Sequence, residues 1–401
     1  MGNSNFPEIY FDSNATTQPL PEVVEAMLQV FKWGFGNPSS PHATGGRARE
    51  YLFRAREAVA SLIGVDPNQI LFTSGATESN NMILSSVLYS RVKPLRLITT
   101  QVEHPSIIKS CEFLAGLGIE VVYLPVDRSG HISLLDFEAS LTTNVALVSV
   151  QWANSETGVI QPVEKIGEIC REHGVLFHTD AAQAVGKVEM NASELPIDFL
   201  SFSGHTFHGP QGTGAIYARD KRQLHPMFLG GPQEYGLRAG TENVPGIVGL
   251  GKAAEIRRER LESVQTQLRE LRDLFETSLL EIMPGTEVNG DREHRICNST
   301  NLMFREIEGQ ALVVQLDQVD IRCSQSSACT HLRPEPSYIL RAMGLSEEEA
   351  YSSVRFSFSE LDTLQEVEIA VRTITKLCRR LRAFKTIMHN GHSSPEVMSL
   401  H

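Results

Sequence analysis

The chain has 401 residues, of which 41% are hydrophobic and 21% charged, and it contains 30 glycines and 19 prolines. This composition excludes disordered, collagen-like and low-complexity proteins and leaves room for a sizeable core. The formal net charge of -12 argues against direct binding to nucleic acids or to anionic membranes.

No apolar run approaches the roughly 18 to 20 residues of a membrane helix, and the first residues lack the layout of a signal peptide. We therefore expect a cytoplasmic protein that does not bind membranes. Six cysteines are scattered without metal-type CxxC spacing, which favours reduced thiols and predicts no metal site. They are Cys111, Cys170, Cys297, Cys323, Cys329 and Cys378.

From about Ala48 to Pro245, helix-like segments alternate with short apolar runs rich in β-branched residues. This alternation predicts an α/β fold with a mostly parallel sheet wrapped by helices. Such sheets bind ligands at the carboxyl ends of their strands. The expected strands are 69–73, 95–100, 120–125, 144–151, 174–180, 197–203 and 214–218.

A charged amphipathic stretch from Ile247 to Met283 predicts one long helix that leads into a second, α+β lobe. We expect residues 15–260 to form a large cofactor-binding domain. A small domain would combine residues 1–14 with 261–385, and residues 386–401 would form a loose tail.

The segment FTSGATESNN, from Phe72 to Asn81, ends a predicted strand and opens a helix at Ser74-Gly75-Ala76-Thr77. Free backbone N–H groups at a helix start, a glycine and hydroxyls suit a phosphate. A plain helix N-cap explains the same residues equally well.

Asp180 directly follows the apolar run of HTDAAQAVG and could pair with a protonated heterocyclic nitrogen, as an electron-sink pyridine cofactor requires. Gln183 lies three residues later on the same helical face, where its amide could bond a ring oxygen. A helix cap is the simpler interpretation of Asp180 alone.

Two further segments place histidines after predicted strands. Ser203 and His205 precede a glycine-rich turn and could grip a phosphate, and His104 in QVEHPS could stack on a planar cofactor and relay protons. A structural histidine is the simpler alternative for His104.

Near the C-terminal end, Cys329 lies in the small-residue segment RCSQSSACTH, which could carry a reactive thiol. Arg355 lies in a strand-like run and could hold a substrate carboxylate with two hydrogen bonds. The alternatives are that Cys329 is an inert cysteine and that Arg355 is a surface arginine. The role of Cys323 stays open.

Together and in this order, these segments resemble the cysteine desulfurases of the class V aminotransferase group, which are fold-type I enzymes dependent on pyridoxal 5′-phosphate. The match runs from YFDSNATT at Tyr10 to RFSFS at Arg355 and includes GNPSSPH, GLRAGTEN and SSACT. It looks closest to the iron-sulfur-assembly branch. The fold implied is a large domain plus a smaller α+β domain.

The resemblance also implies roles for individual residues. His104 would stack on the ring, Asp180 would bind the pyridine nitrogen and Gln183 the ring oxygen. Arg355 would bind the substrate carboxylate, and Cys329 would accept the sulfur as a persulfide. The phosphate would be bound by Ala76, Thr77, Ser203 and His205 and, across a homodimer, by Thr241 of the second subunit.

Several positions depart from the family pattern. Thr206 stands where the family has its Schiff-base lysine, and Gln211 replaces a later family lysine. Ser155 follows Asn154 where an asparagine is usual, and both are expected near the substrate. Tyr235 and the segment SFSELD replace arginines. Pyridoxal phosphate would then be held noncovalently.

We expect a sulfurtransferase that takes sulfur from L-cysteine onto Cys329, releases alanine and passes the sulfur to an acceptor protein. Two alternatives remain. One is a catalytically impaired, cofactor-binding paralogue that scaffolds or regulates an authentic desulfurase. The other is a persulfide relay.

Overall fold

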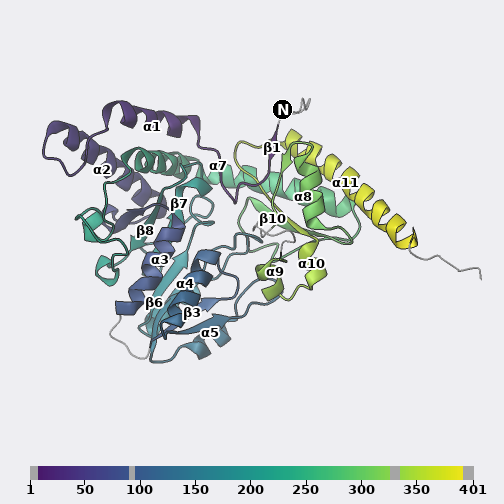
Figure 1. Cartoon of the computed structure of the whole chain (residues 1–401), viewed down its shortest axis with the longest axis horizontal. Helices are drawn as coiled ribbons and strands as arrows, with labels where there is room; N and C mark the ends of the chain where they lie inside the picture. Colours follow the sequence, from purple (N-terminus) through teal and green to yellow (C-terminus); the bar gives the residue numbers. More distant parts are fainter. Residues whose placement is uncertain (1–7, 90–94, 326–334, 392–401) are drawn as a thin grey trace, which may run out of the picture.

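A seven-stranded sheet forms the centre of the larger of two lobes in the computed structural model, which describes residues 8–89, 95–325 and 335–391 (Figure 1). All seven expected strands are present. In sheet order they are β2 (Ile70–Thr73), β8 (Gly214–Ala218), β7 (Phe199–Ser203), β6 (Leu176–Asp180), β5 (Val145–Ser149), β3 (Arg96–Thr100) and β4 (Glu120–Leu124).

The expectation of a mostly parallel sheet is confirmed. Only β8 runs against its neighbours β2 and β7, and the other pairs are parallel. Most strands are buried along their length, which explains their continuous apolar runs. Helices surround the sheet, as the alternating pattern predicted: α2 (Ala43–Ile63), α3 (Ala76–Ser86), α4 (Pro105–Gly116), α5 (Leu134–Ser140) and α6 (Val163–Glu172). A further helix, α1 (Pro21–Trp33), precedes the predicted pattern and packs in the large-lobe core through Val30.

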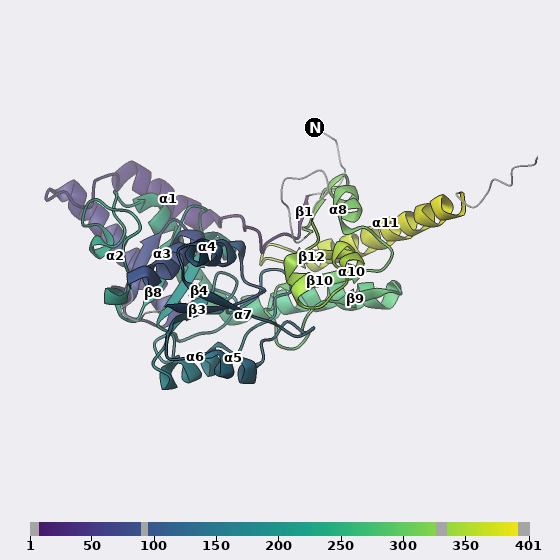
Figure 2. The same ribbon diagram turned by 60° about the horizontal axis from the view of Figure 1, so that its bottom comes forward.

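The long helix is also confirmed, as α7 (Val244–Ile282), with 39 residues. The Asn243 side chain caps its start by accepting a hydrogen bond from the Gly246 N–H at 3.2 Å. The N-terminal part of α7 packs in the large-lobe core through Leu250, and its C-terminal part packs in the small-lobe core through Phe275. Figure 2 shows this helix passing from one lobe into the other.

The smaller lobe is α+β, as expected. Its antiparallel sheet has the order β12 (Ser353–Ser357), β10 (Ser299–Phe304), β9 (Thr286–Val288), and β1 (Ile9–Tyr10) pairs in parallel with β11 (Ile321–Arg322). Its helices are α8 (Gly309–Asp317), α9 (Tyr338–Ala342), α10 (Glu347–Tyr351) and α11 (Leu364–Gly391). Phe11, Phe275 and Phe358 meet in its core, so the N-terminal segment is part of this lobe.

The last helix reaches past residue 386, where we expected a loose tail to begin. Helix α11 continues to Gly391 and projects away from the small lobe (Figure 1). Residues 386–390 contain neither proline nor glycine, so nothing in their backbone chemistry stops the helix before Gly391. Across the described residues, no helix has the length and apolar character that crossing a membrane requires.

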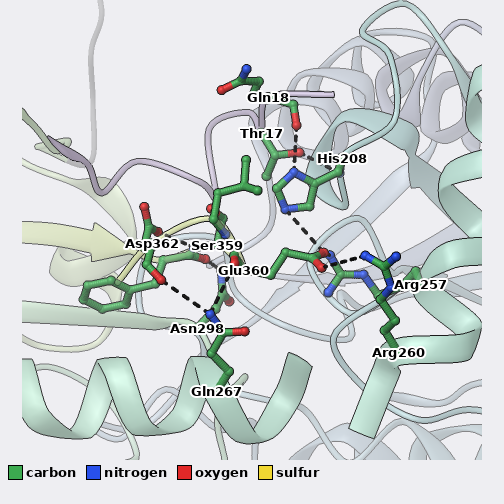
Figure 3. Close-up of polar contacts among 12 residues, drawn as sticks. Thr17, Gln18, His208, Arg257, Arg260, Gln267, Asn298, Ser359, Glu360 and Asp362 are labelled. Carbon is green, nitrogen blue, oxygen red and sulfur yellow. Dashed lines mark hydrogen bonds and ion pairs between the residues drawn. The ribbon is translucent and has the colours of Figure 1, made fainter. Parts of the chain in front are cut away.

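The two lobes meet at Glu360, whose side chain is 9% exposed, in the segment between β12 and α11 (Figure 3). Arg257 of α7 donates to its Oε1 at 2.6 Å, and the His208 Nε2 of the large lobe lies 3.8 Å from the same oxygen. The Gln267 amide donates to the Glu360 carbonyl at 3.2 Å. These contacts fix β12, and therefore Arg355, relative to the large lobe.

Candidate active site

A cavity of about 810 Å³ lies between the lobes at the carboxyl ends of β6 and β7. This is the edge at which an open α/β sheet binds ligands. The cavity collects most of the site residues predicted from sequence, from segments far apart in the chain. Its lining includes Ala76, Thr77, His104, Ser155, Asp180, Gln183, Ser203, His205, Thr206 and Arg355.

The start of α3 forms an anion cradle. Gly75, at the N-cap, has a φ of 153°, a conformation that L side chains rarely adopt. The Ala76 N–H donates to Ser203 Oγ at 2.7 Å, which brings the end of β7 against the helix start. A hollow of about 390 Å³ adjoins these residues and Thr77. The helix N-terminus and the two hydroxyls face one space, so they can bind a phosphate.

His205 adds to this cradle. Its Nδ1 atom is buried and has no hydrogen-bond partner among the described residues. Burial, together with the nearby Lys187 and His104, lowers the pKa of the ring. A buried nitrogen without a partner costs free energy, so this atom fits a ligand that supplies the missing hydrogen bond.

Asp180, the last residue of β6, is buried and accepts two hydrogen bonds. Asn80 Nδ2 donates to its Oδ2 at 2.7 Å, and the Ala182 N–H donates to its Oδ1 at 2.9 Å. An anionic carboxylate at the wall of the cavity suits a protonated heterocyclic nitrogen.

Gln183 follows Asp180 and lies against the N-terminal segment. Its Nε2 donates to the Asn14 carbonyl at 3.0 Å, and its Oε1 accepts from Lys187 Nζ at 2.7 Å. Lys187 also donates to Asn14 Oδ1 at 3.0 Å. Because the Asn14 carbonyl can only accept, it fixes which end of the amide carries nitrogen, and the second Nε2 hydrogen stays available for a ligand.

His104 is the N-cap of α4. Its Nδ1 accepts from the Ser106 N–H at 3.1 Å and lies 2.8 Å from Ser106 Oγ. The preceding residue, Glu103, is fully buried, and burial raises its pKa to about 8. The two interpretations of His104 from sequence therefore coexist, because the ring caps a helix and also lines the cavity.

Arg355 and Ser155 lie together at the small-lobe wall. The Arg355 Nη1 donates to the Ser155 carbonyl at 3.1 Å, as does Asn14 Nδ2 at 3.3 Å. Asn154, in contrast, turns away from the cavity lining. Its Oδ1 accepts from the Glu156 and Thr157 N–H groups, and its Nδ2 donates to the Val102 carbonyl, so its amide organises the loop.

Thr206 lies in the turn Gly204–Thr206 after β7, and its hydroxyl donates to the Ser203 carbonyl at 3.0 Å. Gln211 lines the phosphate hollow and donates to Thr16 Oγ1 at 3.2 Å. Neither side chain carries an amine. Neither can therefore form an imine with an aldehyde.

Among the described residues, the predicted site residues Thr241 and Asn154 lie apart from the cavity lining. Thr241 is exposed on the segment before α7. Cys329 lies outside the described residues, but Ser324 and Glu335 on either side of 326–334 line the cavity. Cys323 is partly buried, and burial raises the pKa of its thiol.

Reasoning from sequence missed three polar residues that hold the site: Asn14, Asn80 and Lys187. Asn80 lies four residues after Ala76 on α3, so helical spacing could have placed it on the same face. No local signal marks Asn14, whose contacts depend on a segment from the other lobe packing here.

Three comparisons agree with this geometry. Residues 9–369 match the family model described as aminotransferase class-V. A cysteine desulfurase from Trichormus azollae is 45% identical over 375 residues, which cover 94% of each chain. A solved NifS-like protein superposes with a TM-score of 0.87 at 36% identity, covering 92% of this chain and 99% of the other. SspA in complex with cysteine gives 0.78 at 35% identity, covering 88% and 99%.

The fold and the site are those of a fold-type I enzyme dependent on pyridoxal phosphate. The chain belongs to the aminotransferase class-V family, and its named relatives are cysteine desulfurases. The residues present fit the family's cofactor. The helix start and the unpartnered His205 Nδ1 suit its phosphate, and the Asp180 carboxylate suits its pyridine nitrogen.

Proposed function

We propose that this chain is a cysteine desulfurase that moves the sulfur atom of L-cysteine onto the Cys329 thiol and releases alanine. In the balanced reaction the Cβ–Sγ bond of the substrate breaks and an S–S bond forms at Cys329. The hydrogen of the Cys329 thiol ends on the methyl group of alanine. One observation carries the proposal: a single cavity holds the phosphate cradle, the Asp180 carboxylate and the Arg355 guanidinium.

Each of these groups supports one part of the task. Pyridoxal phosphate, when bound, supplies an electron-withdrawing ring that stabilises negative charge at the substrate Cα. Asp180 would keep the pyridine nitrogen protonated, and Ala76, Thr77, Ser203 and His205 would hold the phosphate. Gln183 would donate to the ring oxygen, and His104 would lie over the ring as its hydrogen-bonding and proton-relaying group.

Substrate would bind at the small-lobe wall. Arg355 would bind the carboxylate of L-cysteine, with Ser155 close by. With the carboxylate held there, the sulfur of the substrate would point away from Arg355 into the rest of the cavity. Ser324 and Glu335, the lining residues nearest in sequence to Cys329, support delivery of that thiol from the same lobe. Because Thr206 provides no amine, noncovalent contacts would hold the cofactor.

The proposal includes an oligomeric state and an acceptor for the sulfur. We infer a homodimer in which the exposed Thr241 reaches the phosphate of the second subunit, and a cytoplasmic acceptor protein that takes the persulfide sulfur for iron-sulfur cluster assembly. A cofactor-binding scaffold, regulator or persulfide relay is the alternative that Thr206 raises. The named relatives favour the desulfurase.

The test is alanine release from L-cysteine by the purified protein supplied with pyridoxal phosphate. We expect the wild type to release alanine, Cys329→Ser to lose this activity and Cys323→Ser to keep it. Cys323 is the matched control because it lies on the same segment. Absence of alanine from the wild type would overturn the proposal, as would full activity in Cys329→Ser.

A further inference from the structure

Asn80 joins two cofactor-facing groups through one buried side chain. Its Nδ2 donates to Asp180 Oδ2 at 2.7 Å and to Ser106 Oγ at 2.9 Å. Its Oδ1 accepts from the Ser201 hydroxyl. The Asn80 side chain is fully buried, so no water competes for these bonds.

The chemistry of the groups fixes the direction of every bond. An ionised carboxylate only accepts hydrogen bonds, so the amide nitrogen of Asn80 faces Asp180 and Ser106. The amide oxygen then faces Ser201, whose hydroxyl must donate to it. The Ser201 oxygen lies 3.1 Å from His178 Nε2 and is left to accept from that ring.

His178 continues the chain in the same direction. Burial lowers its pKa to about 3, so the ring is neutral and carries one proton. That proton lies on Nε2, which donates to Ser201, and Nδ1 accepts from the Ser149 hydroxyl at 2.9 Å. A buried chain from Ser149 therefore holds the Asn80 amide in a single orientation.

The other branch reaches His104. Ser106 Oγ accepts from Asn80, so its hydroxyl hydrogen is free to donate to His104 Nδ1 at 2.8 Å. The Ser106 N–H donates to the same nitrogen at 3.1 Å. A nitrogen that faces two donors cannot also carry a proton. When the His104 ring carries a single proton, that proton therefore lies on Nε2, the edge of the ring turned away from Ser106.

We propose that Asn80 is a positioning residue that sets the hydrogen-bonding state of both cofactor-facing groups. It holds Asp180 as an acceptor for the pyridine nitrogen, and through Ser106 it holds His104 as the Nε2–H tautomer. His104 thus presents an N–H donor, and no basic nitrogen, to the cavity. For Nε2 to accept a proton, the ring must first move its own proton to Nδ1, which both Ser106 donors oppose. The roles of the two groups rest on the proposed function.

Nitrogen NMR of protein labelled with ¹⁵N-histidine tests the tautomer at pH 8 without cofactor, with His104→Gln identifying the His104 signals. We expect a protonated Nε2 in the wild type. In Asn80→Ala, Ser106 loses the donor that orients its hydroxyl, and the ratio of the two tautomers should fall roughly tenfold. Asn81→Ala is the matched control on the same helix and should leave the His104 signals unchanged.

Two further measurements test the effect of Asn80 on His104 and on the bound cofactor. If Asn80→Ala does not fold, Ser106→Ala removes the hydroxyl branch alone and should shift the tautomer ratio in the same direction. With pyridoxal phosphate added, Asn80→Ala should change the pH dependence of the bound cofactor's absorbance, and Asn81→Ala should not.

A protonated Nδ1 in the wild type would overturn the proposal, as would wild-type His104 signals in folded Asn80→Ala. The NMR result is independent of turnover. A wild type that releases no alanine would therefore refute the desulfurase and leave the tautomer assignment standing.

Discussion

The Arg355 guanidinium pairs with the Asp12 carboxylate, with Arg355 Nη2 and Asp12 Oδ1 2.6 Å apart across 343 positions of sequence. The same guanidinium donates from Nη1 to the Ser155 carbonyl, and its buried Nε has no partner in the described part of the chain. The group proposed to bind the substrate carboxylate is thus already occupied by another carboxylate. A substrate carboxylate bound to Arg355 would share the guanidinium with Asp12, and the two negative charges would repel each other.

Replacing Asp12 should therefore strengthen substrate binding. Asp12→Asn removes the competing charge and keeps the shape of the side chain, so we expect L-alanine, the proposed product, to bind up to about tenfold more tightly. Calorimetric titration of the cofactor-loaded protein measures this change. Glu8→Gln, at an exposed carboxylate that pairs with Arg322, should leave the affinity unchanged. Weaker binding in Asp12→Asn would mean that Asp12 instead aims Arg355 at the substrate.

Lys187 should make the stability of the protein depend on pH. Burial lowers its pKa from 10.5 to about 7, so between these values the unfolded chain holds a proton that the folded chain lacks. The contribution of Lys187 to stability then rises with pH in this range, by up to roughly 1.4 kcal/mol per pH unit. Glu103, whose folded pKa of about 8 lies above its ordinary 4.5, contributes a fall with pH up to about pH 8. Below pH 7 both states are protonated and this contribution stays constant.

Urea unfolding at pH 7, 8 and 9 measures this slope. Lys187→Met should lower this slope by up to roughly 1.4 kcal/mol per pH unit relative to the wild type, whatever its effect on absolute stability, because the removed amine no longer titrates. Lys376→Met, at an exposed position of α11, serves as the control and should keep the wild-type slope. Equal slopes in wild type and Lys187→Met would show that the folded protein buries the charged amine.

The strands and the ends of β6 and β7 could be predicted from sequence because local patterns encode them. A continuous apolar run that ends in Asp180 or Ser203 specifies both a buried strand and a polar residue at the ligand-binding edge. The contacts of Asn14 and Lys187 could not be predicted. They arise only when the N-terminal segment packs between the lobes, and no periodicity describes that arrangement.

The contacts of Asn154 could not be predicted from sequence either. Its place beside Ser155 suggested a substrate role, but the structure uses its amide to close the loop before Gly158. Asparagine side chains satisfy nearby backbone groups as readily as they bind ligands. Sequence alone does not show which neighbours are within reach, so it could not separate these uses.

Glu276 of α7 should be among the costliest carboxylates to remove. Arg295 donates to both of its oxygens, at 2.7 and 3.0 Å, and Thr300 donates to Oε2 at 2.7 Å. The side chains of Glu276 and Arg295 are both buried. Glu276→Gln would therefore leave the positive charge of Arg295 uncompensated. We expect a loss of about 3 to 5 kcal/mol in the free energy of unfolding, measured in urea.

The control for this prediction is Glu270→Gln, an exposed position on the same helix, which should change stability by less than about 0.5 kcal/mol. A small effect of Glu276→Gln would mean that the neutral amide satisfies Arg295 well enough. In that case the Glu276 carboxylate orients Arg295 and Thr300 by hydrogen bonds, and its negative charge adds little to stability.

Thr206→Lys should create a covalent attachment point for the cofactor. Thr206 is buried, lines the cavity and lies three residues after Ser203, so an amine introduced there would enter beside the proposed phosphate cradle. After borohydride reduction and denaturation, we expect the cofactor to stay bound to the introduced lysine in this variant and to be lost from the wild type. Alanine release should rise by roughly 10²-fold or more, because the amine adds covalent and general-base catalysis.

Gln211→Lys places the same amine at the phosphate hollow and controls for nonspecific labelling. Attachment without faster turnover would show that the cavity accepts a lysine but that other departures, such as Ser155, limit the chemistry.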